Sequence, residues 1–240
     1  EVCVDSAASA LAAKRGGADR LELCADLIIG GTTPSLALVR QAKAETGLPV
    51  RALLRPRFGD FCYDRYELAQ MAETATALVQ AGADGIVTGV LTPEGELDVD
   101  ALRPIYAAAR AAAKAAGRPG VGTLHRAFDV CKDPFAVLEA AKALNLGTIL
   151  TSGQAASAPA GASLLRRLVE AAGPDLEILV GAGVTPANLP ALAAETGAHA
   201  FHMSGKQVLD SRMTCRREGV PMGLAGFSEF EVWQPSEETI

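Results

Sequence analysis

The chain has 240 residues, of which 49% are hydrophobic and only 5% aromatic, so it can bury one large aliphatic core. A net charge of −6 and the lack of a basic cluster beyond Arg216-Arg217 exclude the electrostatic footprint of a protein that binds nucleic acid or an anionic membrane. Five scattered cysteines are not typical of a disulfide-stapled secreted domain. We therefore expect a cytoplasmic protein with reduced thiols, no membrane-spanning segment and a small partner.

Short apolar runs alternate with Ala/Leu-rich helical stretches along most of the chain, at a period of roughly thirty residues that suits a βαβ unit. The helical stretches cover residues 6–15, 35–46, 64–81, 98–116, 133–144, 162–172 and 186–196, and several close on a Gly-Ala dipeptide that is typical of a helix-to-strand turn. Eight strands are expected, beginning near Glu1, Arg20, Val50, Asp84, Val121, Thr148, Glu177 and His199. The pattern predicts an α/β fold, a (β/α)8 TIM barrel, as a single domain over 1–240.

The segment 207–240 carries Gly, Pro and aromatic residues without helical periodicity, and we expect it to be irregular. Ser236 followed by two glutamates resembles a helix start. The final helix of the barrel is therefore expected to be absent or truncated, with the natural chain extending beyond residue 240.

The first two strands place two thiols on one face. Period-two alternation puts Val2, Val4, Leu21 and Leu23 against the helices and turns the other side chains into the barrel, namely Cys3, Glu22 and Cys24. Adjacent strands lie about 4.8 Å apart, so the two thiols can meet, and soft thiolates select Cu(I). The alternative is that both cysteines are small buried hydrophobes.

The third strand ends at Arg55, which shares the alternation phase of Arg51 and Leu53. An inward guanidinium needs an anion, and Glu22 on the neighbouring strand is expected to supply one. Two alternatives stay open. The pair can simply neutralise itself, or it can also orient the carboxylate or phosphate of a substrate.

Two histidines follow strands five and eight. His125 with Asp129 four residues later is expected to form an acid/base with an orienting partner, or Asp129 instead ties down the loop or pairs with Arg126. His202 is expected to face inward. At the end of a barrel strand it is a second candidate for the pocket.

Small, glycine-rich strand ends predict a site for an anion, because loops after strands seven and eight hold phosphate in many barrels. The alternative is that their glycines only permit tight turns. The candidate substrate-binding residues are Thr151, Ser152, Gly153, Gly181, Gly183 and Ser204.

Taken together, the motifs EVCVDS, GGADRLELC, GGTTPS, RPRFGDF, GADGIVTGVL, HRAFD, LTSG and FHMS resemble those of the CutC copper-homeostasis family, in the same order and over almost the whole chain. The resemblance implies a TIM barrel, a cytosolic location and homo-oligomers, commonly dimers or tetramers. It also implies that Cys3 and Cys24 match the cysteines proposed as Cu(I) ligands in some members. Met203 stands where some relatives have another Cys, but the alternation points it outward.

Three hypotheses for function follow. The first is a cytosolic copper-homeostasis protein that binds Cu(I) through Cys3 and Cys24. The alternative is a TIM-barrel enzyme, a lyase, isomerase or hydrolase, that acts on a small anionic molecule with His125 or Glu22 as base and Arg55 as clamp. The third is an oligomeric scaffold, which predicts a pocket filled by side chains.

Overall fold

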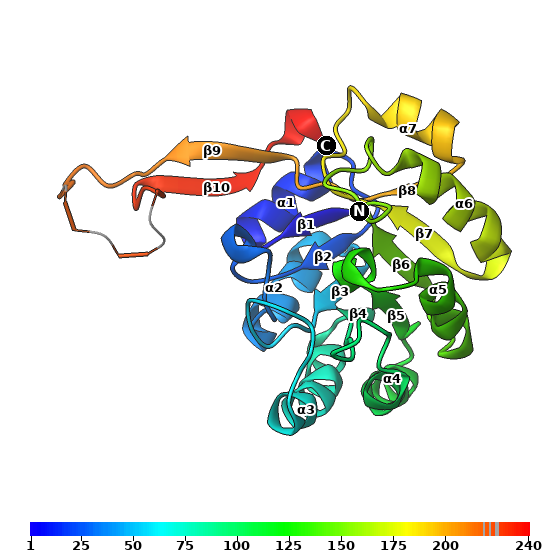
Figure 1. The fold of residues 1–240 in the computed structure, drawn as a ribbon. Coiled ribbons are helices and arrows are strands. Elements are labelled where there is room, and N and C mark those ends of the chain that lie inside the picture. Colours follow the sequence, from blue (N-terminus) through cyan, green and yellow to red (C-terminus); the bar gives the residue numbers. More distant parts are fainter. Residues whose placement is uncertain (218, 221, 224–225) are drawn as a thin grey trace.

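The structure is a computed structural model that describes residues 1–217, 219–220, 222–223 and 226–240. Eight parallel strands follow one another in chain order around a curled sheet, and the helices cover its outer face (Figure 1). The strands are β1 (Val2–Val4), β2 (Leu21–Leu23), β3 (Val50–Leu53), β4 (Gly85–Thr88), β5 (Val121–Leu124), β6 (Thr148–Thr151), β7 (Glu177–Val180) and β8 (Ala200–Phe201). The helices are α1 (Ala7–Arg15), α2 (Leu36–Thr46), α3 (Arg65–Ala81), α4 (Val99–Ala115), α5 (Pro134–Ala143), α6 (Ala162–Ala172) and α7 (Leu189–Thr196).

The sheet closes between its last and first strands. Val2 and Met203 form a parallel bridge. The Cys3 amide donates to the Met203 carbonyl at 3.1 Å, and the Met203 amide donates to the Glu1 carbonyl at 3.0 Å. These bonds confirm the expected barrel, in which all strands end at one mouth.

Most helices begin where the capping residues predict. Ser6 and Ser35 accept a hydrogen bond from a backbone N–H of the first turn, and Asp64, Asp98 and Asp133 do the same. Helix α7 begins later than the expected residue 186, because Thr185 and Asn188 hold a turn through reciprocal bonds between their side chains and amides. No helix in the described ranges is both long and apolar enough to cross a membrane.

Two apolar regions lie on opposite faces of the sheet. Val2, Val4, Leu21 and Leu23 belong to the large core between the strands and the helices. A separate small cluster fills part of the barrel interior and consists of Cys3, Cys24, Leu53 and Val87. The alternation predicted for the first two strands is therefore confirmed.

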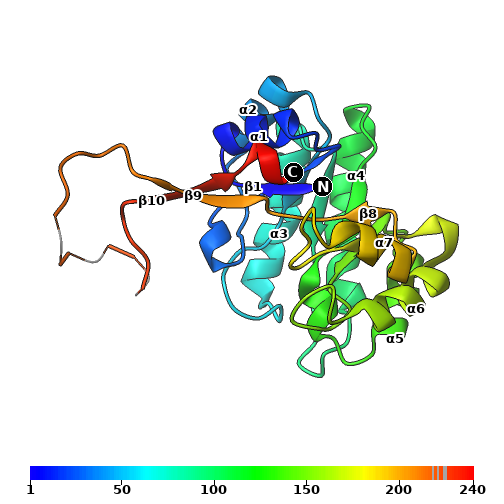
Figure 2. The same ribbon diagram turned by 90° about the horizontal axis from the view of Figure 1, so that it is seen from above.

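The segment after β8 differs from the irregular chain that was expected over 207–240. Strands β9 (Lys206–Asp210) and β10 (Glu231–Pro235) pair antiparallel, and this ribbon projects away from the barrel (Figures 1 and 2). The expectation missed it because Val208, Leu209, Val232 and Trp233 favour strands but are few and far apart. After the ribbon, Ser236 caps a single 3-10 turn, Glu237–Thr239, which lies beside α1.

Candidate metal and ligand site

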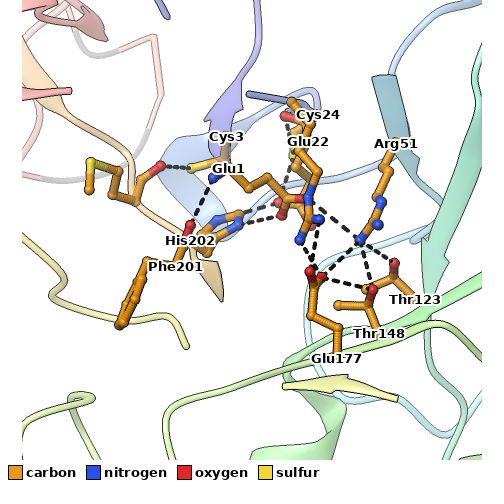
Figure 3. Close-up of polar contacts among 12 residues, drawn as sticks. Glu1, Cys3, Glu22, Cys24, Arg51, Thr123, Thr148, Glu177, Phe201 and His202 are labelled. Atoms are coloured by element: carbon orange, nitrogen blue, oxygen red, sulfur yellow. Dashed lines mark hydrogen bonds and ion pairs between the residues drawn. The ribbon is translucent and has the colours of Figure 1, made fainter. Parts of the chain in front are cut away.

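A layer of paired charges lies inside the barrel, near the start of the strands (Figure 3). Arg20 donates to the carboxylate of Glu1 at 2.7 Å and to that of Glu177 at 2.6 Å. The Arg51 guanidinium lies 3.8 Å from both carboxylates, and it also donates to the hydroxyl groups of Thr123 and Thr148.

His202 lies between two carboxylates. Its Nδ1 is 2.7 Å from Glu1 Oε1, and its Nε2 is 3.7 Å from Glu22 Oε2. Burial opposes a charged imidazole, but the charge of Glu22 and the contacts with Cys3 and Glu1 raise the pKa of His202 well above its usual value. His202 is therefore the cation that balances the negative charge of these carboxylates.

The two glutamates that flank His202 differ in their titration. Burial works against the charge of Glu1, but the hydrogen bond from His202 and the charges of His202, Arg20 and Arg51 lower its pKa to about 2. Burial and the charge of Glu1 raise the pKa of Glu22. Glu1 is thus firmly ionised, and Glu22 is the carboxyl group that takes up a proton more readily.

The two interior thiols lie diagonally on adjacent strands. In the register of β1 and β2, Cys3 lies opposite Glu22, so Cys24 is displaced by two residues along its strand. Cys24 Sγ is 3.6 Å from Glu22 Oε2, and the Cys3 thiol donates to the Met203 carbonyl at 3.7 Å. Burial, followed by the charge of Glu22, raises the pKa of the Cys24 thiol well above its usual value.

Two kinds of metal ligand meet here. Glu1, Glu22 and His202 each offer a donor atom within 4.8 Å of the others, and oxygen and imidazole donors of this kind suit divalent ions. Cys3 and Cys24 add soft sulfur donors beside them. The residues are therefore compatible with a metal ion, and the thiols are the donors that prefer Cu(I).

A cavity of about 610 Å³ opens above these groups at the mouth of the barrel. Glu22, Arg55, His125 and His202, four of the residues expected at the strand ends, line it, whereas Thr151 does not. An open volume of this size speaks against a pocket filled by side chains. The lining includes Cys3, Glu22, Arg55, His125, His202, Gly183 and Ser204.

The expected ion pair between Glu22 and Arg55 is wrong. The Arg55 guanidinium donates to the carbonyl groups of Gly30, Gly31 and Gly59 at 2.9–3.2 Å and lies over the Phe61 ring. The loops after β2 and β3 bring these carbonyl groups inward, so they take the acceptor role that a carboxylate was expected to fill.

The expected pair of His125 and Asp129 is also wrong. His125 Nδ1 accepts a hydrogen bond from the Ala127 amide. The Asp129 carboxylate instead accepts bonds from Thr151, Ser152 and Gln154 and pairs with Arg126. The alternative in which Asp129 ties down the loop is the one that the structure shows. Burial and the charge of Arg55 lower the pKa of His125 to about 3, so the ring is neutral.

The candidate substrate-binding residues divide into two groups. Gly183 and Ser204 line the cavity. Thr151 and Ser152 are fully buried and bond to Asp129. Gly153 and Gly181 are likewise absent from the cavity wall, and an added Cβ at either glycine would lie within 2.6 Å of a neighbouring atom. These four positions serve close packing, which accounts for their small side chains.

Sequence reasoning missed Glu1, Arg20 and Glu177 as parts of the interior, and it gave Arg51 the inward phase of Arg55 without a role. The signal was present, because Glu1 has the alternation phase of Cys3, and Arg20 has that of Glu22 and Cys24. The predicted site contained only residues at the ends of strands, although residues at the starts of strands also face inward.

Comparison with known proteins agrees with the motifs. The sequence model of the CutC family matches residues 1–207. A family protein CutC from Chromobacterium violaceum is 44% identical over 96% of this chain and 90% of its own. A human copper homeostasis protein cutC homolog is 41% identical over 94% of this chain and 80% of its own.

A solved structure supports the fold in the same way. The crystal structure of CutC from Streptococcus agalactiae superposes with a TM-score of 0.76 at 30% identity, and the match covers 84% of this chain and 95% of that one. The eight-stranded architecture is therefore shared with an experimentally determined structure.

Proposed function

This chain belongs to the CutC family, and from that premise we propose that it acts in copper homeostasis in the cytoplasm, by binding Cu(I) through Cys3 and Cys24. The observation that carries the proposal is the placement of two reduced thiols in one interior cluster. Cys3 also lines the cavity at the mouth, which gives the ion a route to the pair.

The charges around the thiols suit a bound monovalent copper ion. Two thiolates and one Cu(I) carry a net charge of −1, and His202 supplies a positive charge beside Cys3. Thiolates must lose their protons to bind a metal. Because burial and Glu22 raise the pKa of Cys24, copper affinity is expected to increase with pH.

The decisive experiment is an anaerobic Cu(I) titration against a high-affinity chelator. Cys62 and Cys215 are exposed and can bind copper adventitiously, so the starting protein is the Cys62→Ser/Cys215→Ser variant. It is compared with the same protein carrying Cys3→Ser and Cys24→Ser. We expect about one copper per chain in the first and none in the second, as a two-thiolate site requires.

The matched control is Cys131→Ser in the same starting protein. Cys131 is also buried, but its sulfur accepts a hydrogen bond from Gln154 and lies outside the interior cluster. Its removal should leave the copper stoichiometry unchanged. Equal binding by the variant without Cys3 and Cys24 would show that these thiols serve only as core residues.

The enzyme hypothesis is not favoured. It needed Arg55 to clamp a substrate together with Glu22, and His125 to be oriented by Asp129. Neither contact forms, since Arg55 bonds to three carbonyl groups and Asp129 bonds to the loop after β6.

The assembly proposed with this function is a homo-oligomer, a dimer or a tetramer. The ribbon of β9 and β10 carries exposed apolar side chains at Val208, Leu209 and Val232, and exposed apolar surface of this kind marks sites of protein association. Light scattering coupled to gel filtration measures the assembly, and a monomeric mass at micromolar concentration would contradict it.

A further inference from the structure

The mouth of the barrel holds two buried N–H donors with nothing to bond. Arg55 and His125 are 8% and 5% exposed, and Arg55 Nε and His125 Nε2 have no hydrogen-bond partner among the described residues. His125 Nδ1 accepts from the Ala127 amide, so the neutral ring carries its proton on Nε2. Both residues line the cavity. A buried donor without an acceptor is costly, and this cost is relieved when an acceptor binds.

The loop after β7 contributes a second set of donors on the same cavity. Ala182, Gly183 and Val184 all line it, and within the described chain no acceptor is found for their three backbone N–H groups. Ala182 and Gly183 both have left-handed φ angles, 74° and 73°. An alanine rarely adopts this conformation, and strained backbone of this kind concentrates at ligand sites.

The charges on the cavity wall favour an anion. Its basic groups are Arg55, Arg126, His202 and Lys206, whereas Glu22 is its one acidic group in the described chain. Arg126 is paired with Asp129, which does not line the cavity, and His202 faces Glu22. Arg55 bonds to neutral carbonyl groups and lies beside the Tyr63 hydroxyl, so its positive charge has no counterion among the described residues.

We propose that the mouth of this barrel binds a small organic anion through its carboxylate or phosphate oxygens, with Arg55 Nε, His125 Nε2 and the backbone amides of residues 182–184 as donors. The cavity of about 610 Å³ is within the range of small-molecule sites. Neither Cys3 nor Cys24 supplies a donor to this anion. The inference therefore goes beyond copper binding and does not depend on it.

The first test is an NMR titration of the metal-free, ¹⁵N-labelled wild-type protein with inorganic phosphate and, separately, with malonate. Sodium chloride at matched ionic strength controls for screening. We expect saturable shifts of the amide signals of residues 182–184 with one or both anions, and the anion that produces them identifies phosphate or carboxylate as the preferred group. Shifts no larger than those with chloride would overturn it.

The second test compares affinities by calorimetry. His125→Phe removes one donor but keeps a flat ring beside Phe61, and Arg166→Gln removes a positive charge at an exposed pair on α6 as the matched control. Hydrogen bonds to charged groups are strong enough that affinity should fall about tenfold or more in His125→Phe and stay unchanged in Arg166→Gln. Equal affinities would refute the donor assignment.

The Cys3→Ser/Cys24→Ser variant separates this proposal from the proposed function. If it loses Cu(I) but keeps the affinity of the wild-type protein for the anion, the two sites are distinct. If anion binding disappears with the thiols, the donors named above are not the ones that hold the anion.

Discussion

The neutral, buried His125 makes the unfolding free energy of the protein depend on pH, by an amount that follows from the structure. Its pKa is about 3 in the folded protein and 6.5 in a free side chain. The unfolded chain therefore takes up a proton that the folded protein does not, and stability is lost progressively as the pH falls from about 6.5 toward 3.

At pH 5 the loss of unfolding free energy depends almost only on how far His125 is protonated in the unfolded chain. That pH lies about 1.5 units below the pKa of the free imidazole, and each unit is worth about 1.36 kcal/mol. His125 should therefore cost about 2 kcal/mol of unfolding free energy between pH 8 and pH 5.

His202 changes the unfolding free energy with pH in the opposite direction. The pH profile of the wild-type stability alone therefore does not isolate the effect of His125. Its pKa is raised in the folded protein, and its stabilising effect is complete below about pH 6.5 and is lost as the pH rises toward the folded value. The two histidines therefore offset each other in part. The quantity to measure is the difference between the wild-type protein and a variant at position 125.

The assay is urea unfolding of the wild-type protein and His125→Gln at pH 8, 6.5 and 5. Gln does not titrate, and its amide oxygen can accept the bond that His125 takes from Ala127. Relative to the variant, the wild-type protein should lose about 2 kcal/mol on acidification. A difference that stays constant with pH would show that His125 titrates near its ordinary value, which would refute its burial as a neutral ring.

Three further predictions test the interior. His202→Gln removes the cation between Glu1 and Glu22 and leaves Glu22 without an ion pair among the described residues, so urea unfolding should show a loss of about 3 kcal/mol or more at pH 7, and a loss below about 1 kcal/mol would contradict the charge given to His202. In native protein two of the five thiols, Cys62 and Cys215, should react rapidly with a thiol reagent because only these are exposed; a third fast thiol would contradict the burial of the others. Gly31→Ala should cost roughly 1–2 kcal/mol, since Gly31 has a φ of 86° and an added Cβ would lie 2.9 Å from Leu53 Cδ2, whereas unchanged stability would show that this loop can relax.

The alternation of the strands made much of the interior predictable. Cys3, Glu22, Cys24 and His202 were placed inward from period two alone. The interior cluster contains both cysteines, and Glu22 and His202 line the cavity at the mouth, which confirms this placement. Capping residues such as Asp64 likewise located the helix starts. Strand alternation and helix capping are both readable from the sequence because each depends on neighbours within a few residues along the chain.

The partners of the inward groups were not predictable in this way. Arg55 bonds to the carbonyl groups of two loops, and backbone acceptors leave no mark in the sequence. Asp129 bonds to amides more than twenty residues away. In both cases a side chain of the expected type stands in the expected place, but the acceptor or donor that it meets depends on loop conformation.

The seam between β8 and β1 joins residues 201 positions apart, through the bond of His202 to Glu1. Strand β8 has only two residues, so few backbone bonds hold the first strand to the last, and local opening at such a place needs less energy than opening elsewhere in the sheet. Cys3 lies on this seam, and its amide is one of those that close it. Cys3 lies on β1 and Cys24 directly after β2, both on one side of the seam, so a copper ion held by the two thiols would not bridge it. Hydrogen exchange at the amides of Cys3 and Met203 should therefore be faster than at the amides that join β1 to β2, and added copper should not remove this difference.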